Sequence, residues 1–106
     1  MTTFDDRESA FEGKFAHDAE MQFKAEARRN KLLGLWAAGL LGKSDDAALD
    51  YAREVIKADF QEAGDEDVYR KVAADVLHLT TEGTIRDQMR LLMIEAKSQL
   101  MGEIQA

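Results

Sequence analysis

The sequence predicts an all-α fold, an antiparallel four-helix bundle preceded by a flexible N-terminal segment. Three observations lead to this prediction. Proline is absent from the 106 residues, so helix is favoured along the whole chain. Apolar residues recur every three or four positions in four separate stretches, which is the period of an amphipathic helix. The connections between these stretches are two to five residues long, which makes successive helices antiparallel neighbours in one domain.

The first two helices are predicted over 19–41 and 45–62, within a bundle that spans 19–106. Gly42 follows the first helix at the position of a left-handed C-cap, and Ser44 is the expected N-cap of the second. The buried stripe of the first helix is predicted to contain Met21, Ala25, Leu32, Leu35, Trp36 and Gly39. That of the second is predicted to contain Leu49, Ala52, Val55, Ile56, Asp59 and Phe60.

The third and fourth helices are predicted over 66–79 and 82–104. Asp65 is the expected cap of the third, and either Thr81 or Thr84 can cap the fourth. The third stripe is predicted to contain Val68, Tyr69, Val72, Val76 and Leu79. The fourth is predicted to contain Ile85, Met89, Leu92, Met93, Ala96, Leu100, Met101 and Ile104.

Residues 1–18 fit this bundle poorly. At about 100° per residue, Phe4, Phe11 and Phe15 fall within about 40° of one another on a helix. This stripe lies about 80–90° from the core stripe of the next helix, so one continuous helix could bury its second half and leave the phenylalanines facing elsewhere. Because the segment is short and contains Gly13, we expect it to be disordered alone and helical on a partner.

Composition and charge limit the function classes. The net charge of −7 makes nucleic acid a poor candidate partner. Without cysteine there is no disulfide, thiolate zinc site or cysteine nucleophile. The longest apolar run, LLGLWAAGLLG, is about half the length that crosses a bilayer, so we expect a cytoplasmic protein with no membrane insertion.

No constellation of residues indicates an enzyme, and we predict no catalytic residue, cofactor or metal. Phosphate-binding glycine loops and a nucleophile elbow are missing from the sequence. Asp75 and His78 are spaced as ligands on one helix face, but a di-metal bundle needs this pair twice with further carboxylates. ATP or ADP would need an unconventional site, formed by the basic residues Arg28, Arg29 and Lys31 beside Trp36. Solvated helix faces explain this basic patch, and a core position explains Trp36, more simply.

The stretches FDDRESAFEGKFAHDAEMQFKAEARRNKLLGLWAA and YAREVIKADFQEAGDEDVYRKV resemble the zeta subunit of the alphaproteobacterial F-type ATP synthase, an ATPase inhibitor family. The resemblance implies a four-helix protein that binds the alpha, beta and gamma subunits of the catalytic head, at the cytoplasmic face of the inner membrane. It implies that the N-terminal segment inserts at the alpha/beta interface next to the gamma stalk and blocks ATP hydrolysis.

A shorter run is similar to the mitochondrial ATPase inhibitor protein, whose pattern appears here as Arg7, Glu8, Ala10, Glu12, Lys14 and Phe15. The predicted partner-binding residues are Phe4, Asp5, Arg7, Glu8, Phe11, Glu12, Lys14 and Phe15. We also hypothesise that His17, beside Asp18, tunes partner binding near neutral pH. Two other functions stay open: a small helical adaptor with a different partner, and a nucleotide-responsive binding protein.

Overall fold

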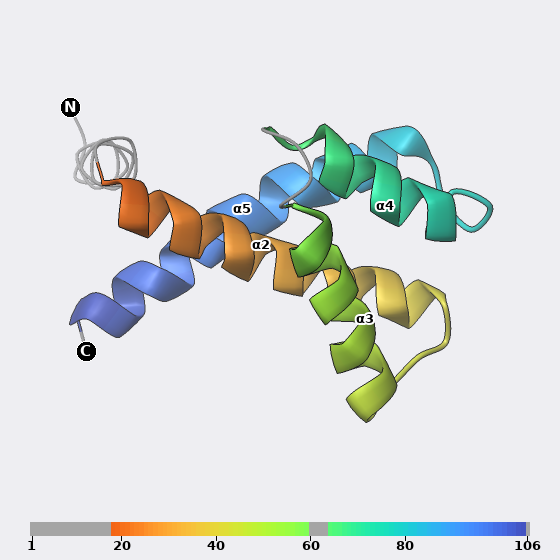
Figure 1. The fold of residues 1–106 in the computed structure, drawn as a ribbon, viewed down its shortest axis with the longest axis horizontal. Helices are drawn as coiled ribbons and strands as arrows, with labels where there is room; N and C mark the ends of the chain where they lie inside the picture. The colour runs from red at the N-terminus through yellow and green to blue at the C-terminus, as the bar shows by residue number, and fades with distance from the viewer. Residues whose placement is uncertain (1–17, 60–63, 106) are drawn as a thin grey trace.

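The computed structural model describes residues 18–59 and 64–105, and this part of the chain is a four-helix bundle (Figure 1). The helices are α2 (Ala19–Leu40), α3 (Asp45–Ala58), α4 (Glu66–Val76) and α5 (Glu82–Gln105). The two long helices α2 and α5 run antiparallel, and α2 begins at the end of the molecule where α5 finishes. The predicted all-α fold class is confirmed.

Helix α2 begins abruptly at Ala19. The backbone of Asp18 is extended, with φ −119° and ψ 104°, and its carboxylate accepts a hydrogen bond from the backbone N–H of Met21 at 3.1 Å. Such a cap satisfies one of the donors that a helix leaves without a partner at its start. The idea of one continuous helix from the front segment through α2 is therefore wrong, and Asp18 belongs to the bundle.

Other chain breaks follow the local chemistry of the sequence. Gly42 follows Leu41, the C-cap of α2, and has φ +76°, a conformation that glycine adopts at little cost. Of the two threonines that could cap α5, Thr81 does so: its hydroxyl oxygen accepts from the backbone N–H of Thr84 at 3.1 Å. Asp65 stands at the N-cap of α4, but its carboxylate contacts Arg29 instead of capping the helix.

Helices α3 and α4 end earlier than predicted. α3 ends at Ala58 rather than residue 62, although 60–63, with Phe60, lie outside the described residues. After Val76 the chain turns, because the N–H of Leu79 bonds to the Val76 carbonyl at 2.8 Å, one residue closer than in an α-helix. Leu79 is consequently 48% exposed, which contradicts its predicted place in the core.

The main core joins all four helices. Its buried members are Leu33, Ala37, Ala38, Ala48, Tyr51, Val55, Val68, Val72, Val76, Ile85 and Met89. The predicted stripe was right for Val55, for the three valines of α4 and for the first two apolar residues of α5. It was wrong for Leu49, which is 37% exposed.

The stripe predicted for α2 was also displaced. Leu32, Leu35 and Trp36 are only partly buried and Gly39 is exposed, whereas Leu33 is fully buried. The cause is a close crossing with α3: a Cβ placed on Gly34 would lie 2.6 Å from the Cα of Ala52. Small side chains must face α3 there, so the larger apolar residues pack beside the contact.

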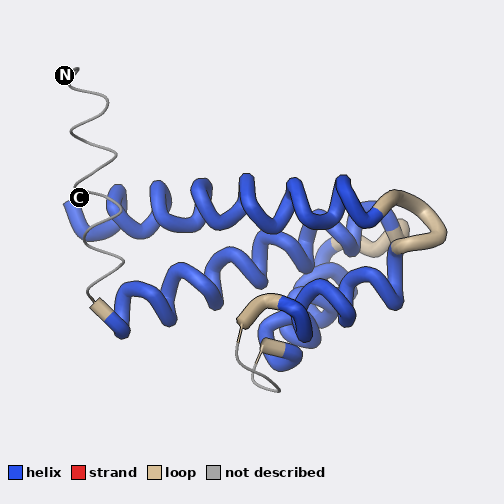
Figure 2. The backbone as a smooth tube through the Cα atoms, turned by 90° about the horizontal axis from the view of Figure 1, so that it is seen from above, coloured by secondary structure: helices blue, strands red, loops and turns tan. Residues whose placement is uncertain are grey.

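Beyond this core, the first half of α2 and the second half of α5 continue as a pair, which we call the arm (residues 19–28 and 93–105; Figures 1 and 2). Its buried residues are Met21, Ala25, Ala96 and Leu100. Met21, Ala25 and Leu100 form one cluster, and Met93 and Met101 are packed partly against it. Ile104, predicted to be in the stripe, is 51% exposed because it lies one turn beyond Leu100, near the end of the pair. The arm therefore has a small, methionine-rich core of its own.

Candidate functional site

The predicted partner-binding residues all lie in 1–17, outside the described residues, as does His17. The structure instead shows the surface to which this segment is joined. Asp18 is the last described residue before it, and it caps α2 at the open end of the arm. The segment therefore connects to the bundle beside the arm and away from the main core.

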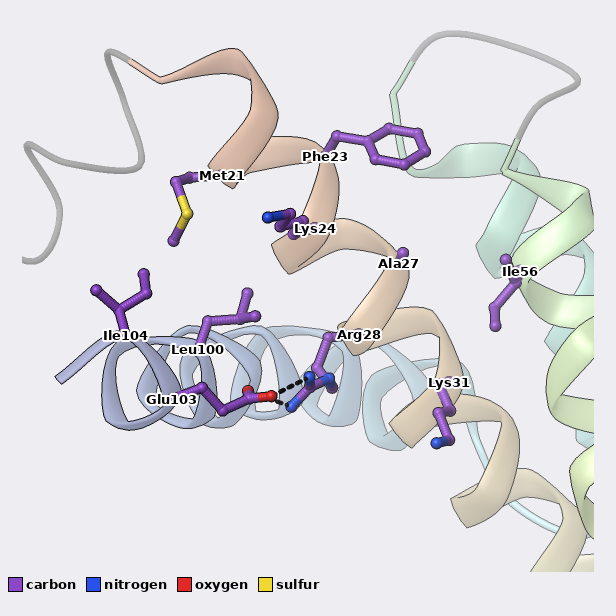
Figure 3. Close-up of a pocket in the computed structure, with 10 residues that line it drawn as sticks. All are labelled: Met21, Phe23, Lys24, Ala27, Arg28, Lys31, Ile56, Leu100, Glu103 and Ile104. Carbon is purple, nitrogen blue, oxygen red and sulfur yellow. Dashed lines mark hydrogen bonds and ion pairs between the residues drawn. The ribbon is translucent and has the colours of Figure 1, made fainter. Parts of the chain in front are cut away.

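An open hollow of about 550 Å³ lies on the arm next to this attachment point (Figure 3). Its apolar lining comes from Met21, Phe23, Ala27, Ile56, Leu100 and Ile104. Three cations, Lys24, Arg28 and Lys31, and the carboxylate of Glu103 complete the lining. The hollow thus combines an apolar surface with an excess of positive charge in an otherwise acidic protein.

Two of these cations have partners on the arm. The guanidinium of Arg28 donates to Gln99 at 2.8 Å and to Glu103 at 3.0 Å, which joins α2 to α5. The hydrogen bond from Arg28 holds the pKa of Glu103 below its usual value. Lys24 contacts Glu20 at 3.2 Å, whereas Lys31 is exposed and has no ion-pair partner among residues 18–59 and 64–105.

The residues considered for nucleotide binding are not gathered in one place. Arg28 and Lys31 share the hollow, but Arg29 points into the protein and is 2% exposed. Its guanidinium donates to Asn30 at 2.7 Å and to Asp65 at 2.9 Å. Trp36 packs against the main core, as expected of a structural residue. This arrangement does not favour a nucleotide site made of these four residues.

Sequence reasoning missed the buried polar pair formed by Arg29 and Asn30, which fixes the start of α4 against α2 through Asp65. A signal was present, because Arg29 lies four residues from both Ala25 and Leu33, two fully buried positions of the same helix. Nearby, Asp59 is the C-cap of α3, and burial raises the pKa of its carboxyl.

Asp75, considered as a metal ligand with His78, is engaged in a structural contact. Its carboxylate accepts from the Tyr51 hydroxyl at 2.8 Å and pairs with Lys71 at 2.8 Å. Burial alone would raise the pKa of Asp75, but these hydrogen bonds hold it below its usual value. Among the described residues there is no cluster of three or more metal-ligating side chains. Nor does that part of the chain contain a helix with the length and apolar character to cross a bilayer.

Comparison with known proteins identifies the family. The model of the family described as ATPase inhibitor subunit zeta matches residues 1–99. The chain belongs to this family. The match includes the N-terminal segment as well as most of the bundle, so both parts of the zeta chain carry the family pattern.

A structure solved by solution NMR is also similar to this zeta chain. The two are 60% identical, with a TM-score of 0.74, over 78% of the zeta chain and 98% of the other. No match was found among curated proteins. At this level of identity the solved structure supports the same helical fold.

Proposed function

We propose that this zeta chain inhibits ATP hydrolysis by the F-type ATP synthase by inserting residues 1–17 at the catalytic alpha/beta interface, next to the gamma stalk. The observation that carries the proposal is the family match, which extends through this segment. The capped start of α2 supports it, because the bundle begins at Asp18 with its own hydrogen bond and needs no helix before it.

The apolar contribution to binding would come from Phe4, Phe11 and Phe15. Burying each side chain fully is worth about 1.5–3 kcal/mol, or about 4.5–9 kcal/mol together. Ordering a flexible segment costs about 2–5 kcal/mol or more, so the phenylalanines alone give modest affinity. Charged contacts of Arg7, Glu8, Glu12 and Lys14, with Asp5, then supply orientation and part of the remaining affinity.

The mechanism is steric and requires no catalytic residue. The catalytic interface must change shape at each rotation step, and a helix lodged between the alpha, beta and gamma subunits blocks that change. The bundle would remain outside the cleft and restrict how the segment enters it. The site of action is then the catalytic head, on the cytoplasmic side of the inner membrane.

The test is ATP hydrolysis by purified synthase heads, with the full chain and with a chain that lacks residues 1–17 but retains the cap Asp18. We expect the shortened chain to lose inhibition while its helical circular dichroism persists. A matched control replaces 1–17 by a glycine–serine segment of equal length, which should also be inactive. Inhibition by either altered chain at the concentration of the full chain would refute the proposal.

A further inference from the structure

The basic side chains of the hollow form a regular stripe along α2. Lys24, Arg28 and Lys31 are separated by four and then three residues, which places them within about 60° of one another on the helix. The stripe is about 10.5 Å long at 1.5 Å per residue. Ala27 lies between these long side chains, and the small residue leaves the space for the hollow (Figure 3).

The N-terminal segment has the complementary pattern. Counted backwards along the chain, the acids Glu12, Glu8 and Asp5 are separated by four and then three residues. On a helix these acids also lie within about 60° of one another, directly beside the stripe of Phe4 and Phe11. A helical segment would therefore present phenylalanine and acid together, to match an apolar lining and a basic stripe.

We infer that residues 1–13 of the unbound protein dock in this hollow, antiparallel to α2, so that the inhibitory segment has a resting site on its own bundle. In this alignment Glu12 faces Lys24, Glu8 faces Arg28 and Asp5 faces Lys31. The docking itself can be measured without the ATP synthase. Its consequence for inhibition rests on the function proposed above.

The chain length permits the alignment. Residues 14–18 form a connection of five residues between the docked segment and α2, which is within the usual length for antiparallel helix pairs. Phe4 and Phe11 are about 10.5 Å apart on a helix, the same length as the basic stripe. The existing pairs of Lys24 with Glu20 and of Arg28 with Glu103 involve exposed acids, so rearranging them has a low cost.

Docking would lower the apparent affinity for the synthase, because the segment must leave the hollow before it binds elsewhere. When half of the molecules are docked, the concentration needed for inhibition doubles. The contact is therefore a modest autoinhibitory device. It also keeps exposed phenylalanines covered while no partner is present.

The absence of cysteine allows a direct test on the full chain. A nitroxide attached to Ser9→Cys should broaden the amide NMR signals of Ala27, in the middle of the hollow, and of Lys31, at the end of the basic stripe farther from the attachment point. Adding Lys31→Glu should reduce this broadening, whereas Lys57→Glu, an exposed lysine of α3 that does not line the hollow, should leave it unchanged. Combining Asp5→Lys with Lys31→Glu should restore the broadening, because the facing charges are exchanged.

Equal broadening in the Lys31→Glu and Lys57→Glu variants would overturn the inference. The inference would also be overturned if broadening appeared only when a nitroxide-labelled chain is mixed with a second, isotope-labelled chain. The segment in the hollow would then belong to another copy of the protein. Loss of inhibition on removing 1–17, together with either of these NMR results, would leave the proposed function standing and remove only the resting site. With docking confirmed, Lys31→Glu should lower the half-inhibitory concentration by about twofold.

Discussion

The main core and the arm of this protein are packed very differently. Four helices meet in the main core, where Leu33, Val55, Val72 and Ile85 have no exposed surface. In the arm only α2 and α5 meet, and the buried residues are three small or flexible side chains and one leucine: Met21, Ala25, Ala96 and Leu100. Stability is therefore concentrated at one end of the molecule. The other end, to which residues 1–17 are joined, is left open for contacts.

The greatest loss of stability is expected when a buried leucine is replaced by alanine, and this loss should differ between the main core and the arm. Leu33→Ala should lower the free energy of unfolding by about 2–5 kcal/mol, because it leaves a cavity among four helices. Leu100→Ala should cost less, near the lower limit of that range, because its neighbours border an open hollow. Urea denaturation measures both, and Leu91→Ala, an exposed residue of α5, is the control. An equal or greater loss for Leu100→Ala would show that the arm is packed as tightly as the main core.

A second test concerns the close crossing of α2 and α3. Gly34→Ala should destabilise the protein by about 1–3 kcal/mol, because the new Cβ meets the backbone of Ala52 and the helices must separate. Gly39→Ala is the matched control on the same helix, since no atom lies within 4 Å of its added Cβ. It should stabilise by up to about 1 kcal/mol through helix propensity. Changes in melting temperature of opposite sign for the two variants would confirm the close crossing, and changes of the same sign would contradict it.

The smallest expected effect is dependent on pH. Burial raises the folded-state pKa of Asp59, so its charged form destabilises the protein, and its position at the C-cap of α3 adds an unfavourable helix-dipole interaction. Asp59→Asn should therefore increase the free energy of unfolding at neutral pH. The gain should vanish below the unfolded-state pKa of about 3.9, where the carboxyl is protonated in both states. A gain that persists unchanged in acid would show that charge is not the cause.

The sequence predicted the parts of the fold that depend on local chemistry. The absence of proline and the apolar spacing indicated four helices, and Thr81 was named correctly as a possible cap of α5. The spacing of Val68, Val72 and Val76 also identified the buried face of α4. These features depend on neighbouring residues in the chain, so a single sequence contains them.

Features that depend on how helices cross could not be predicted in this way. The close approach of α3 at Gly34 places Leu33 on the buried face of α2. The spacing of apolar residues within α2 contains no information about where α3 crosses it. Helix spacing could have placed Arg29 on the buried face, but it could not have identified its partner Asp65, which is 36 residues away in the chain. The hollow likewise arises from side chains of α2, α3 and α5 that meet only in the folded bundle.

We propose that the phenylalanines of the first 17 residues serve inhibition while the bundle supplies its own stability. To test this, inhibition of ATP hydrolysis and the free energy of unfolding are both measured for Phe11→Ala and Phe15→Ala. Ser9→Ala, on the opposite face of a helix, is the control. We predict that each phenylalanine variant weakens inhibition of ATP hydrolysis by about tenfold or more, whereas its free energy of unfolding changes by less than about 0.5 kcal/mol. Unchanged inhibition, or a loss of stability as large as that of Leu33→Ala, would contradict the claim.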